Sequence, residues 1–157
     1  MIVMESELYK KILIATDGSD NTRKAIKYGI ELARIADADV YAVYVLDAGA
    51  FAALPMDAAW ESMYELLRTE GSEALKYVED AGSEAGVPVE GAILDGHPAH
   101  EIVDYATENE IDLIVMGTLG RTGLDRILLG SVASKVVHTS DIPVMIIRGG
   151  QYSEDAL

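Results

Sequence analysis

The chain has 157 residues and no cysteine, and its 27 acidic against 12 basic side chains give a formal net charge of −15. This length fits one domain with a substantial core, and the lack of cysteine excludes disulfides, thiolate metal sites and cysteine nucleophiles. Nucleic acids and anionic membranes attract positively charged proteins, so the charge argues against both as partners. No apolar run approaches the roughly 20 residues of a membrane span, and the N-terminus lacks a signal-peptide pattern. We therefore expect a cytoplasmic protein.

The first half of the chain alternates β-rich runs with segments of helical period. KILIAT, residues 11–16, predicts a strand that ends in a turn, DGS, at residues 17–19. The helix that follows has Ser19 or Asp20 as its expected N-cap. DVYAVYVL, residues 39–46, predicts a strand buried on both faces, as in parallel sheets. The longest predicted helix covers residues 58–85, and its aromatic and methionine stripe reads as a core face.

The second half continues the same alternation. Its predicted elements are a strand in VPVEGAILD, a helix from Pro98, a strand in IDLIVMG, a helix in SVASKVVHTS and a last strand in PVMIIR. Strands that alternate with helices imply a parallel sheet with helices on both faces. Right-handed crossovers favour an α/β doubly wound, five-stranded sheet of order 3-2-1-4-5. We expect one domain over residues 1–148 and a flexible tail over residues 149–157.

The loop after the fourth strand, MGTLGRTGLDRILLGSV, is rich in glycine. In the predicted sheet the winding reverses between strands one and four, where ligands bind beyond the carboxyl ends of the strands. The loop glycines allow a ligand to approach the backbone. Gly130 precedes a helix that Ser131 begins, and free N–H groups at a helix start favour anions. Arg121 and Arg126 would add positive charge. The same glycines also suit a plain flexible turn, and Ser131 a plain N-cap.

The spacing of this loop matches a known motif. Gly117-x2-Gly120-x9-Gly130-Ser131 follows the G-2x-G-9x-G-[S/T] signature of the ATP-binding branch of the universal stress protein family. The chain resembles that family over nearly its whole length, from KILIATDGS through GHPAHEIVDYA to SDIPVMIIR. The resemblance implies a cytoplasmic stress-response protein that binds an adenine nucleotide, ATP, with Mg²⁺ held mainly through the phosphates. It also implies a homodimer formed through the last strand, residues Val144, Met145, Ile146 and Ile147.

The resemblance also assigns residues. Asp17 would bond the ribose or adenine side of the nucleotide, and a role as a helix cap alone is the less favoured alternative. The backbone of Val45 would contact adenine, and Gly96 would form a turn at the rim of the cleft. The full expected nucleotide-binding set is Ala15, Thr16, Asp17, Val45, Met116, Gly117, Gly120, Arg121, Gly130, Ser131 and Val132. Thr118 and Leu119 depart from relatives that carry serine and a polar residue there, and Leu119 cannot donate to phosphate.

Other functions are less well supported by the sequence. The loop lacks the lysine of a Walker A motif, and no GxGxxG follows the first strand. An adenylating PP-loop enzyme would need paired glycines in the first turn, which reads TDGSDN. A receiver domain would need paired acids after the first strand and a lysine after the last strand, and the sequence has neither. A slow ATPase on the same site stays open, but no general base stands out, so we assign no catalytic residue.

Overall fold

The computed structural model describes residues 7–47, 49, 58–118 and 129–149. Strands and helices alternate along the chain as the sequence predicts. The elements are β1 (Lys11–Ala15), η1 (Asp20–Thr22), α1 (Arg23–Ala36), β2 (Asp39–Leu46), α2 (Ala58–Glu84), β3 (Val89–Asp95), α3 (Pro98–Glu108), β4 (Leu113–Gly117), α4 (Ser131–Thr139) and β5 (Val144–Ile147). Several strands are one or two residues shorter than predicted, and the short 3-10 helix η1 was not foreseen.

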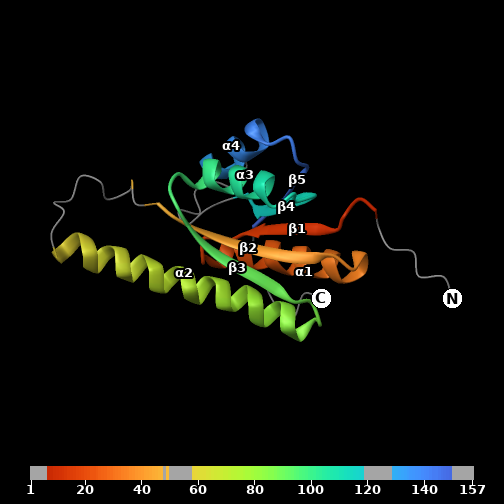
Figure 1. The fold of residues 1–157 in the computed structure, drawn as a ribbon, viewed down its shortest axis with the longest axis horizontal. Coiled ribbons are helices and arrows are strands. Elements are labelled where there is room, and N and C mark those ends of the chain that lie inside the picture. The colour runs from red at the N-terminus through yellow and green to blue at the C-terminus, as the bar shows by residue number, and fades with distance from the viewer. Residues whose placement is uncertain (1–6, 48, 50–57, 119–128, 150–157) are drawn as a thin grey trace.

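The strands form a single five-stranded sheet of order β3-β2-β1-β4-β5, which confirms the predicted topology (Figure 1). All neighbouring strands are parallel. The central strand β1 pairs on both sides: Ile12 lies opposite Val40 of β2 and Leu113 of β4. The winding direction therefore reverses between β1 and β4.

Two helical layers cover the sheet, with α1 and α2 on one face and α3 and α4 on the other (Figure 1). Successive residues of a strand point to opposite faces, so Ile12 and Ile14 pack under α1 and α2 whereas Leu13 packs under α3 and α4. All three side chains are fully buried. Each contributes about 1.5–3 kcal/mol of hydrophobic free energy, and this buried centre fixes the end of β1.

Helix α2 packs on the sheet through its C-terminal part. A Cβ on Gly71 would lie 2.7 Å from Cδ1 of Tyr44, so the absence of a side chain lets the helix come close to β2. Ala74, Leu75 and Val78 are buried, as the predicted core stripe requires.

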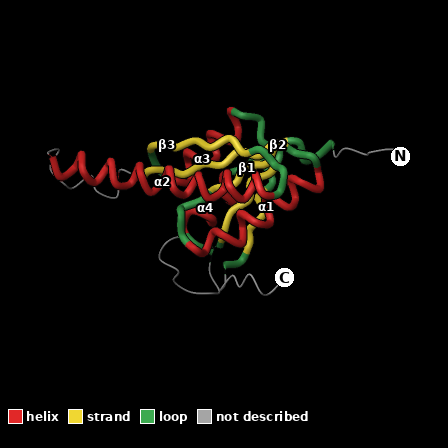
Figure 2. The backbone as a smooth tube through the Cα atoms, turned by 90° about the horizontal axis from the view of Figure 1, so that it is seen from below, coloured by secondary structure: helices red, strands yellow, loops and turns green. Residues whose placement is uncertain are grey.

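The N-terminal part of α2 extends well past the strands (Figures 1 and 2). Met63 is accordingly 38% exposed, so the core assignment was wrong for that residue. Trp60 stacks on Tyr64 with ring centroids 5.5 Å apart, and the Tyr64 hydroxyl lies 3.2 Å from a carboxylate oxygen of Asp95. Tyr64 thus connects this part of the helix to the end of β3 and packs against the margin of the core.

Within the described ranges, which leave out residues 1–6, 48, 50–57, 119–128 and 150–157, no helix has the length and apolar character needed to cross a bilayer.

Candidate functional site

The carboxyl ends of β1 and β4 bring the two halves of the predicted site to one edge of the sheet. Ile14 pairs with Val115, so Ala15 and Met116 are the next residues on neighbouring strands. Both residues are buried, and so are the residues that follow them, Thr16 and Gly117. On β2, Val45 stands two residues beyond Val43, the partner of Ala15. The structure therefore places these predicted residues next to one another.

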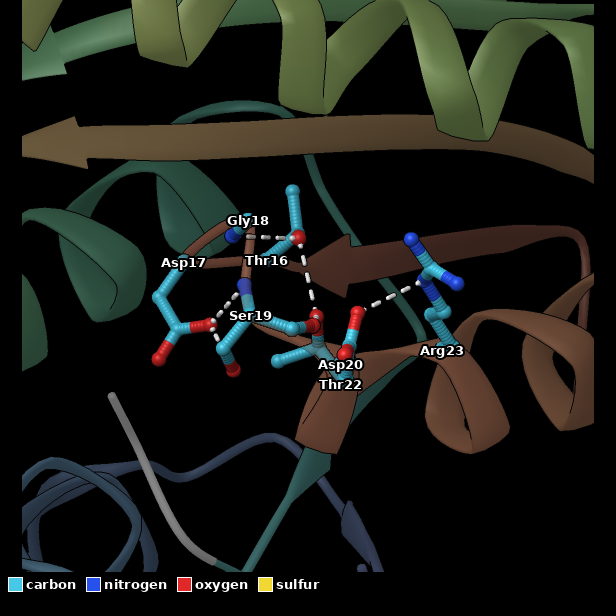
Figure 3. A network of polar contacts seen from close by, with 7 residues as sticks. All are labelled: Thr16, Asp17, Gly18, Ser19, Asp20, Thr22 and Arg23. Carbon is cyan, nitrogen blue, oxygen red and sulfur yellow. Dashed lines mark hydrogen bonds and ion pairs between the residues drawn. The ribbon is translucent and has the colours of Figure 1, made fainter. Parts of the chain in front are cut away.

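The turn after β1 is closed by its own aspartate. Asp17 Oδ1 accepts hydrogen bonds from the Ser19 N–H at 2.9 Å and from the Ser19 hydroxyl at 2.6 Å (Figure 3). This is an Asx turn, in which the side chain replaces a main-chain acceptor. Gly18 adopts φ = +78°, and a Cβ there would lie 3.3 Å from Cβ of Ala74. Glycine therefore suits both the backbone angle and the approach of α2.

Two buried threonines, Thr16 and Thr22, form hydrogen bonds to this turn. Thr22 Oγ1 donates its only hydrogen to the Ser19 carbonyl at 2.8 Å. Thr16 must therefore be the donor in the 3.2 Å contact between the two hydroxyls, and its oxygen accepts from the Gly18 N–H at 3.1 Å (Figure 3). Thr16 and Thr22 are only 6% and 5% exposed. The position of Asp17 is thus fixed by a continuous chain of hydrogen bonds.

The start of the first helix differs from the prediction. Ser19 is the N-cap of η1, but its side chain makes no capping bond and donates to Asp17. Asp20 begins η1, and α1 begins only at Arg23. Thr22 was not predicted as part of this turn. The available signal was a threonine directly before a helical segment, where hydroxyls commonly bond the preceding turn.

A cavity of about 180 Å³ lies on the α2 side of this turn. Its lining includes Thr16, Ser19, Glu70 and Tyr77, but not Asp17. In Figure 3 Thr16 points toward α2, whereas Asp17 points away from it. The cavity and the Asp17 carboxylate therefore lie on different sides of one turn, while Thr16, which also belongs to the predicted nucleotide residues, lines the cavity.

The other half of the site is the start of α4. Gly130 is its N-cap, with φ = −59° and ψ = 161°, and no side chain caps the helix. The Gly130 carbonyl accepts the Ser134 N–H at 2.9 Å. The N–H groups of the first helical turn have no acceptor within the helix, and Ser131 is exposed. Such a helix start is suited to an anion.

Thr118 holds the end of β4 against this helix start. Its carbonyl accepts the Gly130 N–H at 2.6 Å, and its own N–H donates to the Ile147 carbonyl at 3.1 Å. The predicted Gly120 and Arg121, together with Leu119 and Arg126, lie outside the described residues. Ser131 and Val132 begin α4 as the sequence predicts.

The turn between β3 and α3 closes the edge beside β2. The Gly96 N–H donates to the Leu46 carbonyl at 3.1 Å, and Gly96 adopts φ = +143°. Pro98 then begins α3. This turn lies next to the end of β2, one residue beyond Val45. Across the described parts of the chain, His, Asp and Glu side chains form no group of three or more that could hold a metal ion.

The sequence pattern of the Universal stress protein family matches residues 8–148. The chain belongs to the universal stress protein family. Universal stress protein MJ0531 of Methanocaldococcus jannaschii is 50% identical over 141 residues, which cover 90% of this chain and 83% of that protein. Universal stress protein YxiE of Bacillus subtilis is 34% identical over 151 residues, 90% of this chain and 100% of that protein.

Solved structures of universal stress proteins share the fold. Protein MJ0577 of Methanocaldococcus jannaschii superimposes with a TM-score of 0.81 at 28% identity, covering 92% of this chain and 99% of that one. A universal stress protein from Archaeoglobus fulgidus in complex with dAMP gives a TM-score of 0.68 at 26% identity, covering 89% and 98%. One structural neighbour within the family thus binds an adenine nucleotide.

Proposed function

We propose that this universal stress protein binds an adenine nucleotide, ATP in the first place, at the carboxyl edge of the sheet between β1 and β4. The observation that carries the proposal is the placement of the Asp17 turn and the uncapped start of α4 at that same edge. The dAMP complex of the structural neighbour supports the choice of an adenine nucleotide.

The two halves of the site suit the two halves of ATP. Asp17, fixed through Ser19, offers a carboxylate to the ribose hydroxyls, and the backbone of Val45 borders the place for adenine. The Gly130–Ser131 helix start faces the phosphates with free N–H groups and a favourable dipole. Gly120 and Arg121 complete this half in the proposal. When Mg²⁺ is bound, it neutralises phosphate charge, which matters in a chain of net charge −15.

Isothermal titration with ATP and Mg²⁺ tests the proposal, and we expect saturable binding at micromolar protein. Ser131→Pro removes one N–H from the helix start, yet proline at the first helical position is well tolerated. Ser131→Ala removes only the hydroxyl. Because a hydrogen bond to a charged group contributes about 1.5–3 kcal/mol, Ser131→Pro should weaken ATP roughly tenfold or more. Equal affinity of the proline variant and the wild type would remove the helix start from the site.

In the cell we propose a cytoplasmic sensor or switch in stress adaptation, whose state depends on bound nucleotide. The alternative is a slow ATPase on the same site. Phosphate release above the buffer rate, lost in Ser131→Ala, would decide for the enzyme. No release over a long incubation with saturating ATP would decide for binding alone.

We also propose a homodimer formed through β5, whose edge faces away from β4. The Pro143 carbonyl accepts the N–H of Ile114 in β4, and the Ile147 carbonyl accepts the N–H of Thr118, which directly follows β4. The main-chain groups of Val144 and Ile146 therefore point away from β4, since they alternate along a strand. Ile146→Pro removes an outward N–H and keeps the bonds to β4, so it should convert the dimer to a monomer in light scattering. A wild-type monomer at micromolar concentration would contradict this part of the proposal.

A further inference from the structure

The hydroxyl of Thr118 makes a hydrogen bond in addition to the two main-chain hydrogen bonds of this residue. Any residue other than proline at this position could donate its N–H to the Ile147 carbonyl and accept the N–H of Gly130 through its own carbonyl. Thr118 Oγ1 in addition accepts the N–H of Gly149 at 3.3 Å, across 31 positions of sequence. The side chain therefore ties the end of β4 to the segment that follows β5.

Gly149 in turn reaches the other half of the site. A Cβ on Gly149 would lie 3.5 Å from the carbonyl oxygen of Asn21 and 3.6 Å from its Cβ. Asn21 is the middle residue of η1, directly after the Asp17–Ser19 turn. The hydrogen bond between Thr118 and Gly149, and the position of Gly149 beside Asn21, thus connect the phosphate half of the proposed site with its ribose half.

We propose that Thr118 is a positioning residue that holds the two halves of the nucleotide site at a fixed separation through Gly149. The inference rests on the proposed function. A ligand that occupies two half-sites gains affinity from their linkage only while their separation matches its length. Loss of the bond between Thr118 and Gly149 should therefore weaken the binding of ligands that occupy both halves and leave the binding of ligands that occupy one half unchanged.

The test compares Thr118→Val, which has a similar shape but no hydroxyl, with Thr118→Ser, which restores it. Thr107→Val is the matched control, because Thr107 also donates one side-chain bond, to the Val103 carbonyl at 2.9 Å, on an exposed part of α3. The probes are ATP, adenosine and tripolyphosphate, each with Mg²⁺. We expect Thr118→Val to bind ATP roughly three- to tenfold more weakly, with adenosine and tripolyphosphate unchanged. Thr118→Ser and Thr107→Val should bind all three probes like the wild type.

Two outcomes of the titrations would overturn the inference: unchanged ATP affinity in Thr118→Val, or an equal loss for all three probes. If the wild type binds none of the probes, the proposed function fails. Hydrogen exchange of the free protein then tests whether Thr118 supports the turn around Ser19 and Thr22. The Thr22 amide, bonded to the Ser19 carbonyl at 3.1 Å, should then exchange several-fold faster in Thr118→Val than in Thr107→Val. An unchanged rate would overturn the inference.

Discussion

Replacing Thr22 by valine should destabilise the protein and its nucleotide site together. Valine has nearly the shape of threonine but cannot donate to the Ser19 carbonyl or accept from the Thr16 hydroxyl. Thr16 is 6% exposed, so its hydroxyl would lose this acceptor in a place that water hardly reaches. Leaving a buried polar group unsatisfied costs about 1–3 kcal/mol. Because valine fills nearly the same volume as threonine, the substitution creates no new cavity. We therefore expect a loss of about 2 kcal/mol in the free energy of unfolding.

Urea unfolding monitored by circular dichroism measures this loss. At this chain length a change of 1 kcal/mol shifts the melting temperature by about 2–4 °C, so Thr22→Val should melt roughly 4–8 °C lower. Thr107→Val, which loses one exposed hydroxyl bond, should stay within about 0.5 kcal/mol of the wild type. If the two variants prove equally stable, the hydroxyl chain does not support the turn as described. ATP affinity should also fall in Thr22→Val, because the turn that fixes Asp17 is loosened.

Three further changes have definite expected results. Asp17→Asn keeps an acceptor for Ser19 but loses the charge, so stability should hold while calorimetry shows roughly tenfold weaker ATP binding; unchanged affinity would release Asp17 from its proposed role. Gly71→Ala gains about 1 kcal/mol of helix propensity but places a Cβ against the buried Tyr44 ring, at a cost of about 1–3 kcal/mol. Urea unfolding should therefore show a net loss of about 1 kcal/mol, and a gain would mean that the ring yields. Partial burial, with Glu90 and Tyr41 nearby, raises the pKa of Tyr105 above its usual 10.0. The unfolded chain thus ionises first, so stability is full below about pH 10 and falls as pH rises through the raised pKa; Tyr105→Phe should remove part of that fall, and identical profiles would contradict the shift.

The fold could be predicted from the sequence because most strands are continuous apolar runs bounded by clear turn signals. Residues 40–46 and 113–117 are apolar at consecutive positions, which strands buried on both faces require. Alternation with helical segments then leaves few topologies. The overhang of α2 could not be predicted, since the helical period gives the apolar face but not where the sheet beneath it ends. Met63 continues the stripe in sequence and is nevertheless exposed.

For the candidate site, the sequence was sufficient to predict that two chain segments lie at one edge of the sheet. The reversal of winding brings the turn at Asp17 and the helix start at Ser131 to one edge, and the structure places both there. The supporting hydrogen bonds were not predictable, because Thr118 and Gly149 meet only through the alignment of β4 with β5. Thr22 was not predicted, because its burial and its bond to Thr16 arise from the folded turn, which a local pattern does not reveal. Whether these residues hold a nucleotide stays a prediction.

The most direct test of the central claim is a titration of the isotope-labelled protein with ATP and Mg²⁺, followed through its amide NMR signals. We predict saturable shifts that are largest at Ser131 and Val132 on one side and at Asp17 and Ser19 on the other, with smaller changes at Glu70 and Tyr77 in the neighbouring cavity. Shifts that concentrate at Glu70 and Tyr77, or no saturable shift at millimolar ATP, would contradict the account.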